Sequence, residues 1–155
     1  MLEEQVDLWD LTRYDVALCI TTNGFVKKNG ENVMGRGCAL ELKQRCPDFP
    51  KVFGNMINLV GNRLVVWESE EVPALNKLGY KHLITFPVKH NWWENADVEL
   101  IKKSAIDLMA LIDVSDITKV YLPRPGCGCG GLNWEKDVRP VLQPILDDRI
   151  IVVWK

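Results

Sequence analysis

The chain of 155 residues lacks the excess of basic residues that a protein binding duplex DNA normally carries. It has 19 lysines and arginines against 21 aspartates and glutamates, for a formal net charge of -2 at pH 7. Neutralisation of phosphates by basic side chains supplies most of the non-specific affinity for duplex nucleic acid. We therefore expect no strong duplex nucleic-acid footprint.

The sequence also has no apolar run of the length that spans a bilayer. Residues 1–10 are acidic, whereas a secretory signal is basic and then apolar. We expect a cytoplasmic protein that does not bind membranes.

Histidines are scarce, and the cysteines follow no disulfide or metal-binding pattern. There are two histidines, His82 and His90, and five irregularly spaced cysteines, which favours reduced thiols. Cys127 and Cys129 form one close pair, but a structural zinc site needs a second pair or suitably spaced histidines. We predict no metal site and no cofactor.

The composition is that of an ordinary globular domain, with 47% apolar and 26% charged residues. The chain contains no internal repeat, low-complexity segment or linker. We expect residues 1–155 to form a single domain, and a monomer, because no apolar stripe is left over for a partner.

Apolar patterns predict strands that alternate with helices. The predicted strands are residues 5–9, 16–20, 56–60, 63–68, 82–86, 118–122 and 150–154, and the predicted helices are residues 38–46, 96–112 and 134–148. Residues 56–60 and 63–68 flank Gly61 and Asn62, which predicts a hairpin. The alternation implies an α/β protein with a mixed, mostly parallel sheet.

Six of the eleven glycines fall in two short runs, each between a predicted strand and a predicted helix. Backbone N–H groups in such loops, together with a helix N-terminus, bind phosphate without a basic excess. Two loops at equivalent positions favour a diphosphate-type ligand over two ordinary tight turns. Neither loop fits the G-x-G-x-x-G fingerprint or the P-loop, so dehydrogenases and kinases are not favoured.

Four segments resemble those of macro domains, which bind ADP-ribose. LPRPGCGCGGLNW at residues 122–134 resembles the second ligand loop of that family. VDLW at residues 6–9 is similar to its first-strand motif, and Asn23 with VMGRGCA at residues 33–39 resembles its first ligand loop. FPVKHNW at residues 86–92 resembles a segment of the branch that includes the terminal ADP-ribose protein glycohydrolases and the DNA ADP-ribosyl glycohydrolase antitoxins. The resemblance implies a three-layer α/β/α macro-domain-like fold.

The same resemblance implies a set of ligand contacts. Asp7 would accept a hydrogen bond from the adenine amino group, Asn23 would reach a ribose hydroxyl, and the two loops would hold the pyrophosphate through backbone donors. The residues implied in ADP-ribose binding are Asp7, Leu8, Thr22, Asn23, Met34, Gly35, Gly37, Cys38, Ala39, Pro123, Gly126, Cys127, Gly128, Cys129, Gly130 and Gly131.

The resemblance also implies a catalytic lysine, Lys89, acting on the anomeric carbon of ADP-ribose. A lysine in a partly dry cleft acts as a nucleophile or as a base. The protein-acting members of the branch carry an aspartate in the second loop, where this chain has Gly130. Lys89 would then work without that acid, or His90 would serve as its acid–base partner. A structural role for His90 is the alternative.

Three functions remain open at this point, each with ADP-ribose or an ADP-ribosylated macromolecule as the partner. The first is hydrolysis of an ADP-ribosyl linkage by Lys89. The second is removal of phosphate from ADP-ribose 1″-phosphate, with Asn23 and His90 as the catalytic residues. The third is a non-catalytic ADP-ribose reader, which Gly130 favours.

Overall fold

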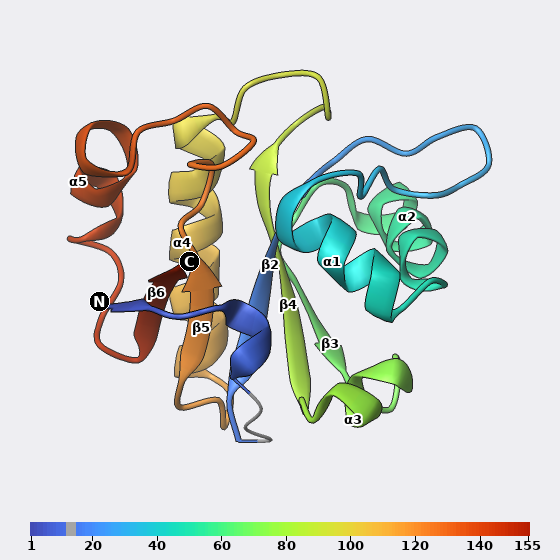
Figure 1. Ribbon diagram of the computed structural model, residues 1–155, viewed down its shortest axis with the longest axis horizontal. Coiled ribbons are helices and arrows are strands. Elements are labelled where there is room, and N and C mark those ends of the chain that lie inside the picture. Colours follow the sequence, from blue (N-terminus) through green and yellow to red (C-terminus); the bar gives the residue numbers. More distant parts are fainter. Residues whose placement is uncertain (12–14) are drawn as a thin grey trace.

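The computed structural model, which describes residues 1–11 and 15–155, is built around a sheet of six strands (Figure 1). The strands are β1 (Leu2–Gln5), β2 (Ala17–Asn23), β3 (Val65–Glu68), β4 (His82–Lys89), β5 (Val120–Pro123) and β6 (Ile150–Trp154). Their order is β1-β6-β5-β2-β4-β3, and every neighbouring pair is parallel except β3 with β4. The predicted mixed, mostly parallel sheet is confirmed.

β2 lies in the interior of the sheet because its residues are apolar on both faces. Leu18 and Ile20 belong to one core cluster, and Ala17 and Cys19 belong to the other. All four are fully buried. Since successive side chains of a strand point to opposite faces, a strand covered on both sides needs such a continuous apolar run.

Helices cover both faces of the sheet. α1 (Gly37–Arg45), α2 (Phe49–Val60) and α3 (Ala74–Leu78) pack into one core cluster, and α4 (Val98–Asp113) and α5 (Arg139–Leu142) pack into the other. Figure 1 shows α1 and α2 on one side of β2 and β4, with α4 and α5 on the other. The predicted three-layer α/β/α fold is confirmed. Among the described residues, no helix combines the length and the apolarity needed to cross a bilayer.

The predicted hairpin of residues 56–60 and 63–68 is wrong, because residues 56–60 are the end of α2. Phe49, Phe53 and Ile57 are buried on this helix, and their spacing places them on one helical face. The predicted strand at residues 63–68 does form, as β3, but it pairs with β4. The apolar run at residues 56–60 is the last part of an amphipathic helix that begins at Phe49. Taken alone, so short a run fits a strand equally well.

Two further predicted elements differ from the structure. The strand predicted at residues 5–9 lies earlier, as β1, and shares only Gln5 with the prediction; Asp7 caps a 3-10 turn, η1 (Leu8–Asp10). The helix predicted at residues 134–148 is a π-helical turn, η2 (Trp134–Val138), followed by the short α5. The proline that follows α5 has no N–H with which to continue it.

The loop between β2 and α1, residues 24–36, is held against α2. Asn32 N donates to Pro50 O over 2.9 Å. Gly54 permits the close approach, because a Cβ at that position would overlap the carbonyl oxygen of Gly30. Packing on α2 therefore fixes the loop that leads into α1.

Gly54→Ala should destabilise the protein, although alanine is ordinarily the better helix former by about 1 kcal/mol. The added Cβ would overlap the Gly30 carbonyl oxygen, so we expect a loss of about 1–3 kcal/mol in urea unfolding, the usual cost of overpacking. Asn55→Ala, at the next and exposed position of α2, is the matched control and should be neutral or stabilising. A Gly54→Ala protein as stable as wild type would contradict this close packing.

Candidate functional site

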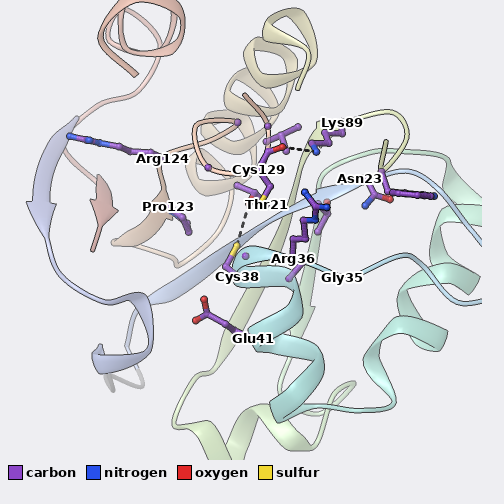
Figure 2. Close-up of a pocket in the computed structure, with 18 of the residues that line it drawn as sticks. Thr21, Asn23, Gly35, Arg36, Cys38, Glu41, Lys89, Pro123, Arg124 and Cys129 are labelled. Carbon is purple, nitrogen blue, oxygen red and sulfur yellow. Dashed lines mark hydrogen bonds between the residues drawn. The ribbon is translucent and has the colours of Figure 1, made fainter. Parts of the chain in front are cut away.

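A cleft of about 760 Å³ opens at the carboxyl ends of the parallel strands (Figure 2). The ends of β2, β4, β5 and β6 and both glycine-rich loops contribute to its lining. Ligands of open α/β sheets bind at this edge, and the volume is typical of a small-molecule site. We therefore take this cleft as the candidate functional site.

The first glycine loop brings the N-terminus of α1 to the cleft. Gly35, Gly37, Cys38 and Ala39 all line it. Gly37, with a φ of +58°, begins the helix, and the side chain of Arg36 at the N-cap makes no hydrogen bond to it. The first N–H groups of a helix carry a partial positive charge. This side of the cleft is therefore suited to an anion.

The second glycine loop, residues 124–131, folds tightly on itself. Gly126 and Gly131 have φ values of 73° and 76°, which glycine adopts readily. A Cβ at Gly130 would lie 2.7 Å from the Cα of Gly126 and 2.8 Å from the Cβ of Ala96. The loop thus has no room for a side chain at Gly130, which gives a steric reason for the absence of an acid there.

Most of the predicted site residues line the cleft. These are Leu8, Thr22, Asn23, Gly35, Gly37, Cys38, Ala39, Lys89, Pro123, Gly126, Gly128, Cys129 and Gly130. The structure places the others outside the lining, namely Asp7, Met34, His90, Cys127 and Gly131.

Asp7 borders the cleft and already has two partners. Its Oδ1 accepts a hydrogen bond from Trp9 N over 3.0 Å, and its Oδ2 lies 3.2 Å from Lys155 Nζ. The backbone hydrogen bond from Trp9, helped by Lys155, holds the pKa of Asp7 below its usual value. Since its neighbours Val6 and Leu8 line the cleft, this ionised carboxylate sits at one rim.

Met34, Cys127 and Gly131 lie outside the lining of the cleft, and each has a structural position. Met34 is 2% exposed and belongs to the core beneath α1 and α2. Cys127 Sγ donates to Pro125 O over 3.3 Å, and burial raises the pKa of its thiol to about 11. Gly131 supplies the positive φ at which the second loop ends.

Lys89 reaches from the end of β4 to the second loop. Its Nζ donates to the carbonyl oxygen of Cys129 over 3.0 Å (Figure 2). Its own carbonyl oxygen accepts from Gly24 N and Asn62 Nδ2 over 3.1 and 3.0 Å. These bonds fix both ends of the residue and hold its amino group in the wall of the cleft.

His90 lies outside the lining of the cleft, and its ring pairs with a carboxylate. Its Nε2 lies 2.7 Å from Asp97 Oδ2, and its side chain is more than half exposed. The hydrogen bond from His90 is the main reason that the pKa of Asp97 is lowered. Asp97 Oδ1 also accepts from Glu99 N over 2.9 Å at the start of α4. Asp97 is the N-cap of α4, and His90 holds its carboxylate, which is a structural role for His90.

Asn23 uses most of its side chain to hold the first loop. Its Nδ2 donates to Val33 O over 2.8 Å, and its Oδ1 accepts from Phe25 N and Asn32 Nδ2 over 3.0 and 3.3 Å. A side-chain amide has two N–H donors and two acceptor positions. One N–H is left for a ligand, which fits the predicted ribose contact better than a catalytic role.

The buried thiol in the cleft lining, that of Cys38, is a poor nucleophile. Cys38 Sγ lies 3.2 Å from Thr21 Oγ1, and burial raises the pKa of this thiol. A thiol that stays neutral is a poor nucleophile. Within residues 1–11 and 15–155, no group of three or more His, Cys, Asp or Glu side chains is placed to hold a metal ion.

Residues outside the predicted site set complete the lining, although several of them lie within the motif segments quoted above. They are Val6, Thr21, Phe25, Lys27, Val33, Arg36, Glu41, Val88, Trp92, Arg124, Val153, Trp154 and Lys155. Thr21, Val88 and Val153 had a usable signal, because each stands near the carboxyl end of a predicted parallel strand. Lys27 and Glu41 had none, because only the folded loop and helix bring them to the cleft.

Comparison with known protein families identifies the family of this chain. The model of the family described as Macro domain matches residues 28–141. The chain belongs to the macro domain family. The matched segment contains both glycine loops and Lys89.

Two curated relatives of this macro domain are DNA ADP-ribosyl glycohydrolases. That of Mycobacterium tuberculosis is 32% identical over 130 residues, which are 81% of this chain and 34% of that protein. That of Thermus aquaticus is 25% identical over 122 residues, which are 77% of this chain and 32% of that protein. The chain thus matches about a third of the length of these relatives.

Solved structures share the fold over nearly the whole chain. The macrodomain of Mycobacterium tuberculosis DarG superposes with a TM-score of 0.76 at 27% identity, covering 99% of this chain and 97% of that one. Thermosipho africanus DarTG in complex with ADP-ribose has a TM-score of 0.76 at 20% identity, covering 95% of this chain and 39% of that one. At 20% identity the likeness concerns the fold.

Gly130→Ala should destabilise this macro domain, whereas Gly128→Ala in the same loop should not. A Cβ at Gly130 would press on Gly126 and Ala96, but one at Gly128 would meet nothing within 4 Å. In thermal or urea unfolding we expect a loss of about 1–3 kcal/mol for the first variant and a change within about 0.5 kcal/mol for the second. Equal stability of the two variants would argue against the tight loop.

Proposed function

We propose that this macro domain binds ADP-ribose in the cleft and hydrolyses the bond between ADP-ribose and a DNA base. The observation that carries the proposal is Lys89, held by Cys129 O in the wall of a cleft formed by two glycine loops. The curated relatives are DNA ADP-ribosyl glycohydrolases, and a protein of the same fold is in complex with ADP-ribose. Both facts support this ligand and this reaction.

The pyrophosphate would lie between the two loops. Gly35 and Gly128 line the cleft, and a Cβ at either would meet no other protein atom within 4 Å. A phosphate can therefore approach the backbone N–H groups closely. The N-terminus of α1 and the guanidinium of Arg36 add positive charge on the same side.

The adenosine would occupy the end of the cleft formed by β5 and β6. Pro123, Val153 and Trp154 supply apolar surface there. The guanidinium of Arg124 lies 3.9 Å from the centroid of the Trp154 ring, which helps to fix the indole. A carboxylate has about four acceptor positions, so Asp7 can still accept from the adenine amino group at this rim.

Lys89 would act at the anomeric carbon. In the net reaction water cleaves the bond, so the carbon gains a hydroxyl and the DNA base gains a proton. As a nucleophile, the neutral amine bonds to the anomeric carbon while the DNA base leaves, and water then displaces the amine. As a general base, it accepts a proton from the attacking water. Cys129 O orients the amino group in either role.

The phosphatase function has less support from the geometry. It requires a positioned water and a general base, for which the sequence offered Asn23 and His90. Asn23 is engaged in holding the first loop, and His90 pairs with Asp97 outside the cleft lining. A non-catalytic reader would share the binding site and differ from the proposed enzyme in turnover alone.

Thr22→Val should weaken ADP-ribose binding without loss of stability. Thr22 Oγ1 is buried in the cleft lining and has no hydrogen-bond partner among the described residues. Removing an unpaired buried hydroxyl should leave the free protein as stable or more so, as urea unfolding would show. A ligand that uses this hydroxyl should bind roughly three- to tenfold more weakly in calorimetry. Thr22→Ser is the control, and unchanged affinity for Thr22→Val would place the ligand elsewhere.

Lys89→Ala should lower the rate of ADP-ribose release from an ADP-ribosylated DNA oligonucleotide by roughly 100-fold or more. Binding of free ADP-ribose should persist, because the loops and Thr22 remain. Lys102→Ala, an exposed lysine of α4, is the matched control and should retain full turnover. Chromatography of the released product measures the rate, and undiminished release by Lys89→Ala would refute the role of this lysine.

The same wild-type preparation separates the remaining alternatives. Release of phosphate from ADP-ribose 1″-phosphate would favour the phosphatase, and ADP-ribose binding without any turnover would favour the reader. The intact mass of protein quenched during a single turnover distinguishes the two roles of Lys89, because only the nucleophile gains a covalent ADP-ribosyl adduct.

A further inference from the structure

A group of exposed aromatic side chains borders the cleft. Trp92 and Trp93 are 52% and 59% exposed, and their rings meet edge to face with centroids 5.6 Å apart. Phe25 meets Trp93 in the same manner at 5.3 Å. Phe25 and Trp92 also line the cleft. We refer to Phe25, Trp92 and Trp93 as the aromatic rim.

The aromatic rim lies at the Lys89 end of the cleft. Asn23 and Lys89 are paired at the ends of β2 and β4, and the rim residues follow them within four residues in the chain. The backbone of Phe25 is tied to Asn23 Oδ1 over 3.0 Å, and Gly24 N donates to Lys89 O over 3.1 Å. A group attached to the anomeric carbon at Lys89 would therefore have the aromatic rim beside it.

The two exposed tryptophans differ from the buried ones in how their indoles are used. Trp67 Nε1 donates to Thr85 Oγ1 over 3.1 Å, and Trp134 Nε1 donates to Glu3 Oε1 over 2.9 Å. Both of those side chains belong to core clusters, whereas Trp92 and Trp93 belong to neither. Large exposed aromatic surface at the mouth of a cleft is typical of a recognition site.

Cationic side chains accompany the aromatic rim. Lys27 and Arg36 line the cleft, and within the described part of the chain neither forms an ion pair. Figure 2 shows Arg36 extending from the start of α1 in the direction of Lys89. The acid in the lining, Glu41, lies 3.6 Å from Lys155 Nζ, which Asp7 also contacts, so both carboxylates are at the Lys155 end of the cleft. The Lys89 end of the cleft is therefore the end with unbalanced positive charge.

Aromatic faces next to unpaired cations form the usual surface for single-stranded nucleic acid, because bases stack while the cations meet phosphates. A duplex keeps its bases stacked within itself and offers no free face to an indole. We propose that the aromatic rim stacks bases of a single DNA strand whose ADP-ribosylated base lies at Lys89, and that Lys27 and Arg36 contact its phosphates. This subsite rests on the proposed function and adds recognition of the strand to recognition of ADP-ribose.

Trp93→Ala is the decisive variant, because Trp93 belongs to the aromatic rim but does not line the cleft. Its KM for an ADP-ribosylated single-stranded DNA oligonucleotide should rise about tenfold, the usual effect of losing one base–aromatic stack. Its affinity for free ADP-ribose should be unchanged, and Trp93→Phe should retain most of the wild-type KM. Val114→Ala removes an even more exposed apolar side chain, at the C-cap of α4, and should behave as wild type.

Lys27→Gln tests the contact with phosphate by its dependence on salt. Each phosphate contact on a single strand contributes about 0.7 to the slope of log affinity against log salt concentration. Fluorescence anisotropy of a labelled, ADP-ribosylated single strand over 50–200 mM salt (roughly the range over which such slopes are measured) should show a slope shallower by about that amount. An unchanged slope would remove Lys27 from the strand contact.

Three results would overturn the aromatic rim as a DNA subsite. They are an unchanged KM and affinity for the strand in Trp93→Ala, an equal loss of affinity for free ADP-ribose, and an equal loss of turnover on an ADP-ribosylated protein. Failure of the proposed function is a separate result. A wild-type protein that binds the modified strand through Trp93 but never releases ADP-ribose would refute the hydrolase and leave the subsite standing.

Discussion

The second ligand loop depends on one backbone contact, that of Gly130 against Gly126. Because neither residue has a side chain, the loop folds back far enough for Leu132 N to donate to Gly126 O over 2.9 Å. The fold brings Cys129 O within 3.0 Å of Lys89 Nζ. The same contact that excludes an acid from the loop thus positions Lys89, so the proposed reaction uses this lysine without a second-loop carboxylate.

The opposite wall of the cleft also depends on a glycine, but one that lies outside the wall itself. Gly54 of α2 lets the loop after β2 settle on the helix, and Asn23 then ties that loop to the end of its strand. Both walls are shaped by close contacts that only glycine permits. The groups that they present to the cleft are largely backbone N–H groups and the N-terminus of α1. A chain with a net charge of -2 can hold a diphosphate in this way, because the donors are backbone N–H groups and not an excess of basic side chains.

The features of this site that could be predicted are those with a local sequence signal. The apolar run of β2 and the glycines after the strands are local signals, and they led to the sheet and to both loops. The strand predicted at residues 56–60 is wrong because a five-residue apolar run fits a strand as well as the end of a helix. Met34 and His90 lie in motif segments, but packing directs one into the core and a carboxylate holds the other. Lys27 becomes recognisable as a neighbour of the site only when the loop after β2 is folded.

Residues 96 and 97 join the parts of the site into one unit. Ala96 N donates to Gly130 O and Asp97 N donates to Val88 O, each over 2.9 Å, and Asp97 also caps α4. The second loop cannot swing outward without breaking its bond to Ala96 and straining the last turn before α4. The second loop is therefore a rigid wall of the cleft and is unsuited to act as a hinged lid.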